Sequence, residues 1–516
     1  MKRCEVDKNK LSPMMLQYLN IKEQNEDAII FFRLGDFYEM FFEDAELVSR
    51  LLELTLTGKN CGLEERVPMC GIPYHAYLGY LEKLVSLGYK VAICEQLTPP
   101  DKKGVVERGV VQIVTRGTLM ESSALDEKTN NYIGSIYDYN HCYAISYADI
   151  STGVMYSILI DYDEEKLINE IIRIDIKELI VNDKINRKIL NTLREKYNIL
   201  ITISNNLLEE QYEHTYENIQ DIRITNSIKH LLFYLQEMKK GNLNHLQKSI
   251  IIDKNDSLEI DVHSKRNLEL VQTLRLKERT YSLLWMLDKT KTAMGSRLLK
   301  KWIESPLVNK QKIEKRYELI STLLTEFILK EELRDLLNNV YDLERLSGRI
   351  AYGNLNARDL TQLKNSIKTF PEIKKILKEI NYEDTFDTLD DLKDLLEKSI
   401  NEDAPITIKE GNIIKPGYNE ELDNLKSLSS GGKDFILKLE QQEKERTGIK
   451  NLKVGFNKVF GYYIEVSKSN VDQIKEEYGY VRKQTLTTGE RYITSELKEK
   501  EDIILNSEEK SIAMEY

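Results

Sequence analysis

The spacing of apolar residues changes near residue 257, and this change constrains the fold of the 516-residue chain more than any other feature of its sequence. Before residue 257, short apolar runs suited to strands alternate with amphipathic stretches suited to helices, which is the pattern of α/β domains. After it, apolar residues recur at helical spacing, until a β-rich segment interrupts them at residues 448–488. We therefore predict a multidomain protein in which α/β domains precede an all-α part with a small β insertion.

Residues 1–119 are predicted to form a mixed α/β domain. Ser12 and Pro13 combine an N-cap residue with a proline at the first helical position, so a helix should begin there and run to about Lys22. Gly88 is expected to end a later helix. The elements expected after the first helix are strands at residues 28–34, 37–42 and 90–94 and helices at residues 45–54 and 75–87. Their alternation predicts a mixed sheet with helices packed on it.

Residues 124–250 are predicted to form a second α/β domain, in which helices and strands alternate as in a doubly wound fold. Strand-like runs lie at residues 132–136 and 142–147, and a turn near Asp149 leads into the next run. An aspartate in this position could belong to a nuclease metal site. Metal-dependent cleavage of a phosphodiester usually needs several converging carboxylates, and no partners can be assigned, so we interpret Asp149 as a turn residue.

Residues 257–447 are predicted to be helical. Amphipathic helices are expected at residues 267–274, 296–303, 343–350 and 357–370. From residue 420 to residue 447 the pattern becomes long, charged and sparsely apolar, which predicts one extended helix. Gly431 and Gly432 fall in its middle, where each glycine costs about 1 kcal/mol relative to alanine, so they should soften the helix locally.

Residues 448–488 alternate in the manner of strands, and residues 489–516 are predicted to form a second long helix. Thr487 and Glu490 resemble a capping box, which places the start of this helix near residue 489. The helical pattern continues to Tyr516 without a glycine stop. The P-loop pattern, GxxxxGK followed by Ser or Thr, occurs nowhere in the chain.

Phe37 and Glu39 stand out within the first of these domains. The strand period predicts two faces, with Phe37, Glu39 and Phe41 on one and Tyr38, Met40 and Phe42 on the other. Phe37 and Glu39 would then lie about 6.6 Å apart, which pairs an aromatic ring with a hydrogen-bond acceptor. From the residues alone, a phenylalanine in an aromatic run is usually part of the core, and an isolated glutamate is usually solvated.

The composition limits the classes of function. A net charge of −11 does not favour a nucleic-acid binder, so DNA binding would need a local basic patch. Residues 448–488 contain seven Lys or Arg and four acidic residues, so their local net charge is positive, as DNA binding requires. No apolar run approaches the roughly 20 residues of a membrane span. Five cysteines without a CxxC pair argue for a reducing cytosol and against a metal site.

Six motifs, in order along essentially the whole chain, resemble those of the bacterial MutS family of DNA mismatch-repair proteins. They are Ser12 to Met15, Phe32 to Phe41, Pro68 to Ala76, Val91 to Gln96, Leu287 to Gly295 and Gly461 to Ile464. The resemblance implies five segments: a mismatch-recognition domain at residues 1–119, a ribonuclease H-like connector at 124–250, a helical core with a lever helix at 257–447, a small β DNA clamp at 448–488 and a returning lever helix at 489–516.

The resemblance also implies roles for individual residues. Phe37 would enter the duplex from the minor groove and stack on a mispaired base, where unstacking costs less than in intact DNA. Glu39 would accept a hydrogen bond from the displaced base, or donate one when protonated, and would penalise binding to matched duplex. Contacts to the DNA backbone are expected from Arg108, Lys458, Arg482 and Lys483. No catalytic, cofactor-binding or metal-binding residue is expected.

The family's P-loop ATPase and dimerisation domain, with its ATP and magnesium, is expected to be missing, so this chain should not be an enzyme and should hold no cofactor. The implied partners are duplex DNA with mismatches or small loops, a MutL-type repair protein and a second copy in the full-length family, with no membrane. The implied location is the cytoplasm, at the nucleoid.

Two alternative functions remain open at this point. One is a metal-dependent nuclease built on the ribonuclease H-like connector, which Asp149→Ala would inactivate. The other is a helical scaffold for a protein partner, for which salt-dependent DNA binding would be absent.

Overall fold

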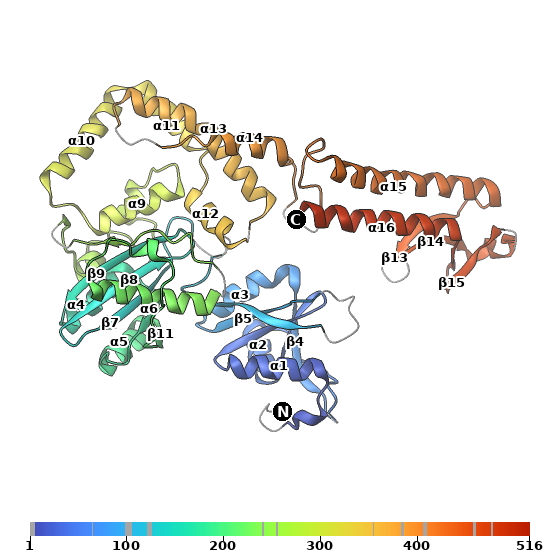
Figure 1. The fold of residues 1–516 in the computed structure, drawn as a ribbon, viewed down its shortest axis with the longest axis horizontal. Helices are drawn as coiled ribbons and strands as arrows, with labels where there is room; N and C mark the ends of the chain where they lie inside the picture. Colours follow the sequence, from blue (N-terminus) through green and yellow to red (C-terminus); the bar gives the residue numbers. More distant parts are fainter. Residues whose placement is uncertain are drawn as a thin grey trace. The chain divides into compact units, whose positions relative to one another are not determined.

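The computed structural model describes the chain from residue 6 to residue 516, with gaps at residues 64, 99–105, 121–125, 240–241, 254–255, 354, 383–385, 406–409, 458–460 and 476–477. Only the backbone is described for residues 9, 429–437, 500 and 502–505. The chain divides into two compact units: Met1–Leu355 with Pro371–Thr385, and Asn356–Phe370 with Phe386–Tyr516. Figure 1 shows the elements of both units.

A six-stranded mixed sheet forms the first part of the first unit, as predicted. Its order is β3-β4-β2-β1-β5-β6, and of its paired strands only β1 and β5 run parallel. The strands are β1 (Ala28–Leu34), β2 (Phe37–Phe41), β3 (Thr57–Lys59), β4 (Val67–Pro73), β5 (Lys90–Gln96) and β6 (Arg108–Val114). Helix α1 (Pro13–Gln24) packs on the face that bears Phe32, and helices α2 (Phe42–Leu52) and α3 (Tyr77–Ser86) pack on the face that bears Phe31.

Local signals set the ends of two helices as predicted. The Ser12 side chain accepts a hydrogen bond from the backbone N–H of Met15 at 3.4 Å, and Pro13 is the first residue of α1. At the other end of the domain, Gly88 follows α3 with a φ of +93°, a conformation that glycine adopts without strain. Both predictions rest on interactions within a few residues of sequence, which is why they are confirmed.

The end of β2 differs from the prediction. Phe42 begins α2, three residues earlier than expected, and it packs in the same cluster as Phe41 rather than on the opposite face. The cause is Asp44 in the first turn of α2. Its carboxylate accepts hydrogen bonds from the ammonium of Lys22 at 2.9 Å and from the backbone N–H of Ile30 at 3.2 Å. These long-range bonds hold the start of the helix against the neighbouring strand.

A second six-stranded sheet follows, in the order β11-β10-β7-β8-β9-β12. Its strands are β7 (Tyr132–Asp138), β8 (Cys142–Asp149), β9 (Val154–Asp161), β10 (Glu178–Val181), β11 (Leu200–Ile203) and β12 (Ile250–Ile251). Helices α4 (Glu164–Ile174) and α5 (Arg187–Tyr197) cover one face and α6 (Ile222–Lys239) covers the other, as in the doubly wound fold that we predict. The difference is that β7, β8 and β9 form an antiparallel meander, whereas β10 runs parallel to both β7 and β11.

Helices dominate the chain beyond this sheet. They are α7 (Val262–Asn267), α8 (Leu283–Leu287), α9 (Ala293–Glu304), α10 (Lys310–Thr325), α11 (Phe327–Leu337), α12 (Leu343–Tyr352), α13 (Ala357–Glu379) and α14 (Asp390–Ser399). The helices expected at residues 296–303 and 343–350 are confirmed as α9 and α12. Among the described helices, none combines the length and the hydropathy that spanning a bilayer requires.

The helix predicted at residues 267–274 does not form. Helix α7 ends at Asn267, and Glu269 takes a positive φ of 49°, which turns the chain away from the helix axis. The Glu269 carboxylate then accepts a hydrogen bond from the backbone N–H of Leu274 at 2.6 Å, which replaces a helical partner. The apolar period in this segment is therefore not the signature of a helix, because Leu268 and Leu274 are exposed.

Helix α13 is longer than predicted. It begins at Ala357 as expected but continues to Glu379, with Pro371 inside it. A proline removes one backbone hydrogen bond and usually ends a helix, which is why the prediction stops at residue 370. Ile367 before the proline and Ile376 after it are both buried, and their packing holds the helix together across this position.

Asp288 joins α8 to α9. Its side chain is 3% exposed, accepts hydrogen bonds from the hydroxyls of Ser296 at 2.6 Å and Thr290 at 2.5 Å, and pairs with Arg279. Burial disfavours the charged carboxylate, but the hydrogen bonds from Ser296 and Thr290 outweigh this effect and lower the pKa of Asp288 to about 2. The motif at residues 287–295 therefore serves to fix the junction between two helices.

The second unit carries two long helices and a small sheet (Figure 1). Helix α15 (Glu420–Thr447) spans the predicted residues and remains helical through Gly431 and Gly432. An antiparallel sheet in the order β13-β14-β16-β15 lies between α15 and α16 (Ser495–Glu515) in the sequence. Its strands are β13 (Lys453–Asn457), β14 (Gly461–Ser467), β15 (Val481–Thr485) and β16 (Gly489–Ile493).

The second long helix begins later than predicted. Residues 489–493 form β16 rather than a helical turn, and Thr494 is the N-cap, its side chain accepting a hydrogen bond from the backbone N–H of Leu497 at 3.2 Å. The reason is strand pairing, because Gly489 lies so close to the backbone carbonyl of Val466 that a Cβ atom would overlap it. A long-range contact therefore overrides the local capping pattern.

The small sheet is joined to α16 at Gly461. This residue has a φ of +80°, and a Cβ atom there would overlap the carboxylate of Glu501 on α16. The same buried carboxylate accepts hydrogen bonds from the backbone N–H of Tyr462 at 2.7 Å and from the ammonium of Lys498 at 2.6 Å. Glycine is thus required where the sheet meets the helix.

Candidate nucleic-acid interface

The hairpin of β1 and β2 holds Phe37 and Glu39 on one face of the first sheet. Gly35 and Asp36 form its turn, with Gly35 at a φ of +58°, and the register pairs Leu34 with Phe37. Phe37 follows the turn directly and is 47% exposed, whereas the next residue, Tyr38, is buried on the opposite face. The alternation predicted from the strand period is confirmed over these residues, and Phe37 is not part of the core.

Phe37 and Glu39 flank Gly71 of the neighbouring strand β4. A Cβ atom added at Gly71 would lie 3.6 Å from Cγ of Glu39 and 3.8 Å from Cδ1 of Phe37, so both side chains border the same backbone position. Because glycine has no side chain, the space between them stays open. The ring of Phe37 and the side chain of Glu39 therefore both border the backbone of Gly71.

Lys59 is the partner of Glu39, and it is a residue that the sequence analysis misses. Its ammonium lies 2.5 Å from Oε2 of Glu39, with the two side chains 33% and 16% exposed, and 5.8 Å from the ring centroid of Phe41. Lys59 sits on β3, which is only three residues long and lies beyond β4 in the sheet. Only the order of the strands brings it to Glu39, so no local signal could have identified it.

The opposite face of β2 fixes the direction in which Phe37 points. The hydroxyl of Tyr38 donates a hydrogen bond to the carboxylate of Glu95, and its ring centroid lies 5.6 Å from that of Tyr74 and 5.2 Å from that of Tyr77. Burial raises the pKa of Tyr38 well above its usual value, so this hydroxyl keeps its proton. The contacts of Tyr38 on the opposite face therefore hold in place the strand that carries Phe37.

Arg108, a predicted contact to the DNA backbone, begins β6 on the same face of the sheet. Its Nε donates to the carbonyl of Arg33 at 2.8 Å and its Nη1 to the carbonyl of Val106 at 3.0 Å, and its guanidinium lies 5.2 Å from the ring centroid of Phe32. Burial lowers the pKa of Arg108. Two of its donors are thus engaged within the protein, and its contact to DNA stays a prediction.

Arg482 and Lys483, two further predicted contacts, lie on the edge strand β15 of the second unit. The register shifts between Arg482 and Gln484, which makes Lys483 the extra residue of a β-bulge. Both side chains are exposed, and Arg482 pairs with Glu490 at 3.2 Å. The fourth predicted contact, Lys458, lies outside the described residues.

Asp149 is buried at the end of β8 and closes a turn, as we interpret it from the sequence. Its carboxylate accepts hydrogen bonds from the backbone N–H of Ser151 at 3.0 Å, the hydroxyl of Ser151 at 2.6 Å, the side chain of Asn130 at 2.8 Å and the backbone N–H of Asn131 at 3.2 Å. Within the described part of the chain, no group of three or more His, Cys, Asp or Glu is placed to hold a metal ion.

Three family models match successive parts of this architecture. MutS domain I matches residues 12–123, MutS domain II matches residues 131–247 and MutS domain III matches residues 263–511. The first match contains the sheet with Phe37, the second contains strands β7 to β11 of the sheet with Asp149, and the third contains helices α8 to α15 and the small sheet. The class of protein is therefore a chain of several MutS-type domains.

Curated relatives named DNA mismatch repair protein MutS match almost all of the chain. The relative from Bacillus subtilis is 47% identical over 512 residues and that from Clostridium tetani is 48% identical over 521 residues, and both matches cover 98% of this chain. This chain belongs to the MutS family. It spans 59% of the length of each of these two relatives.

Proposed function

We propose that this chain binds duplex DNA at mismatched or looped-out bases, with Phe37 as an inserted wedge and Glu39 as the acceptor for a displaced base. The observation that carries the proposal is the half-exposed ring of Phe37, held beside a carboxylate over the bare backbone of Gly71. Stacking a base on an aromatic ring contributes about 1–3 kcal/mol. A mismatch is already stacked and paired poorly, so insertion there costs less than in intact duplex.

Lys59 completes the proposed site. A lone carboxylate would be repelled by the phosphates of DNA, and the ion pair at 2.5 Å offsets that repulsion while it orients Glu39. A displaced base with a free N–H group can take the place of Lys59 as the partner of Glu39. Matched duplex offers no such group, so the carboxylate favours defective DNA over intact DNA.

We also propose finer identities for the remaining parts of the chain. The antiparallel meander β7–β9, followed by the parallel strands β10 and β11, supports a ribonuclease H-like connector. The four-stranded sheet between the long helices α15 and α16, with Arg482 and Lys483 on its edge strand, supports a DNA clamp at the end of lever helices. Arg108 and Lys458 remain proposed contacts to the DNA backbone.

The activities of the longer relatives are proposals for this chain as well. On the family resemblance, we propose that catalysis and ATP binding in the longer relatives lie outside the 59% of their length that these residues match, and that a MutL-type protein and a second copy are partners of the longer proteins. The proposed location is the cytoplasm, at the nucleoid. The nuclease alternative has no support in the geometry of Asp149, whose carboxylate is engaged in the turn.

The test is a fluorescence anisotropy titration with a duplex that carries one unpaired base and with its matched counterpart, each at two salt concentrations. Wild type is compared with Phe37→Ala and with a control, Leu87→Ala. Leu87 is 56% exposed in the same domain but follows α3, next to the end of the sheet where Lys90 pairs with Ala28, away from the β1–β2 turn.

We expect wild type and Leu87→Ala to prefer the defective duplex and Phe37→Ala to lose that preference by about tenfold, the equivalent of one stacked base. Retained preference in Phe37→Ala would contradict the wedge assignment. An absence of salt-dependent DNA binding would instead favour a protein-interaction scaffold, because a protein that contacts phosphates releases counterions.

A further inference from the structure

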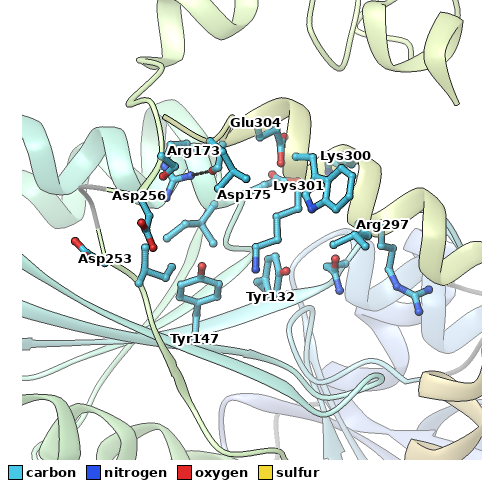
Figure 2. Close-up of a pocket in the computed structure, with 18 of the residues that line it drawn as sticks. Tyr132, Tyr147, Arg173, Asp175, Asp253, Asp256, Arg297, Lys300, Lys301 and Glu304 are labelled. Atoms are coloured by element: carbon cyan, nitrogen blue, oxygen red, sulfur yellow. Dashed lines mark hydrogen bonds between the residues drawn. The ribbon is translucent and has the colours of Figure 1, made fainter. Parts of the chain in front are cut away.

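A cavity of about 320 Å³ lies within the first unit, between helix α9 and the sheet strands β7 and β8 (Figure 2). Tyr132 and Tyr147 line it from the strands, and Lys301 and Trp302 line it from α9. Arg316 of α10 closes one side, with its guanidinium 3.5 Å from the ring centroid of Trp302. The cavity contains none of the residues assigned above to DNA binding.

Three of the four carboxylates that line this cavity have cationic partners. Three ion pairs account for them: Asp175 with Lys177 at 2.6 Å, Asp256 with Lys312 at 2.6 Å and Glu304 with Lys265 at 2.5 Å. The remaining carboxylate, Asp253, also has an interaction.

Some cations around the cavity lack such a partner. Within the described residues, Lys300, Lys301 and Arg316 have no carboxylate in ion-pair distance, whereas Arg173 pairs with Glu170. The lining therefore carries uncompensated positive charge, which favours an anion.

Lys301 is the cation that is aimed into the cavity. Figure 2 shows its side chain reaching from α9 toward the sheet, where the rings of Tyr132 and Tyr147 face it. Its ammonium lies 3.8 Å from the ring centroid of Tyr156. Burial, reinforced by the charge of Arg173, lowers the pKa of Lys301 to about 8. This ammonium is therefore partly stripped of water without having gained an anionic partner.

Tyr147 supplies a second donor. Its side chain is only 5% exposed, and no protein acceptor for its hydroxyl is found among the described residues. This hydroxyl is therefore available to donate to a bound group, and a desolvated ammonium without an anionic partner costs free energy. An oxyanion could accept hydrogen bonds from both Lys301 and Tyr147, and a cavity of this size with Tyr132 and Trp302 in its lining suits a flat organic body.

We propose that this cavity binds a small organic anion, with its phosphate or carboxylate group held by the Lys301 ammonium and the Tyr147 hydroxyl. The proposal goes beyond DNA recognition and does not depend on it. The helix α9 and the strands β7 and β8 lie in different matched domains, so the anion would join MutS domain III to MutS domain II within the first unit.

Equilibrium dialysis of the full 516-residue chain tests the proposal, at constant ionic strength, with radiolabelled inorganic phosphate, phenyl phosphate and benzoate as probes. Three variants are compared with wild type: Lys301→Met, which keeps the length of the side chain but removes its charge, Lys301→Arg, which restores the charge, and Tyr147→Phe. Lys315→Met is the control, because Lys315 is an exposed residue of α10 that does not line the cavity.

We expect saturable binding at one site, with phenyl phosphate or benzoate bound more tightly than inorganic phosphate. Affinity should fall at least tenfold in Lys301→Met and severalfold in Tyr147→Phe, and should return in Lys301→Arg, while Lys315→Met matches wild type. The absence of saturable binding would overturn the proposal, and so would equal affinities in Lys301→Met and Lys315→Met. Organic probes no tighter than phosphate would overturn the assignment to an organic ligand.

Discussion

Replacing Glu39 by alanine should strengthen binding to matched duplex DNA, and the ion pair with Lys59 determines how this gain depends on salt. In the free protein the pair is partly exposed, with 33% of the Lys59 side chain and 16% of the Glu39 side chain accessible. An exposed ion pair contributes about 0.2–1 kcal/mol, so its loss should leave the fold intact. The substitution therefore acts mainly by removing a negative charge and by releasing the ammonium of Lys59.

The released ammonium of Lys59 is available to a phosphate. Each additional phosphate contact changes the slope of log K against log salt by about −0.9 on duplex DNA. Between about 50 mM and about 200 mM salt, the gain from Glu39→Ala should consequently shrink by about three- to fourfold. In a Lys59→Ala background there is no ammonium to release, so Glu39→Ala should raise the affinity less and leave the slope unchanged.

The assay is a double-mutant cycle by fluorescence anisotropy, in which wild type, Glu39→Ala, Lys59→Ala and the double variant are titrated with matched duplex and with a duplex that carries one unpaired base. Discrimination between the two duplexes should narrow in Glu39→Ala. An equal gain and an equal slope for Glu39→Ala in both backgrounds would show that the carboxylate acts without Lys59, which would refute the reasoning.

Two further predictions concern the framework. Asp288→Asn should lower the free energy of unfolding by about 2 kcal/mol at about pH 7, because the folded state lowers the pKa of this carboxyl from 3.8 to about 2. The stabilisation is fully present above the unfolded-state pKa, and it is lost as the pH falls toward 2. Urea unfolding followed by the fluorescence of Trp285 and Trp302 should show that the difference in unfolding free energy between wild type and Asp288→Asn is halved near about pH 3. A difference that does not change with pH would contradict the stabilising role of the Asp288 carboxylate. Gly461→Ala should lower the free energy of unfolding by about 2 kcal/mol, because alanine is strained at the positive φ and its Cβ atom would overlap Glu501. Unchanged rates of hydrogen exchange in β14 would contradict this prediction.

The parts of the fold that could be predicted are those set by neighbours in sequence. The strand period places Phe37 and Glu39 on one face because side-chain alternation depends only on the backbone of β2. The capping side chain of Ser12 starts α1 because its acceptor and donor are three residues apart. The bounds of α15, residues 420–447 with the two glycines inside, could be predicted because the pattern of a long charged helix does not depend on contacts with another segment.

The parts that could not be predicted are set by contacts between distant segments. Lys59 reaches Glu39 only through the order β3-β4-β2 of the first sheet. In the second unit, Gly489 belongs to a strand because it pairs against β14, although the residues around it match a helix cap. A local signal of about 1 kcal/mol cannot compete with several ladder hydrogen bonds and the burial of Gly489 and Tyr492 in the strand.

The pairing of Glu39 with Lys59 also explains how the proposed DNA site is compatible with a chain of net charge −11. Attraction to phosphates would favour all DNA equally, whereas a neutral ion pair beside an exposed ring contributes little until the duplex deforms. In the proposed complex at a defect, the ring of Phe37 would gain a stacking partner and Glu39 would gain a base donor, while Lys59 would become free to meet a phosphate. Each of these gains requires the opening of the duplex, so the affinity of the proposed site for DNA should increase with the ease of deforming the duplex.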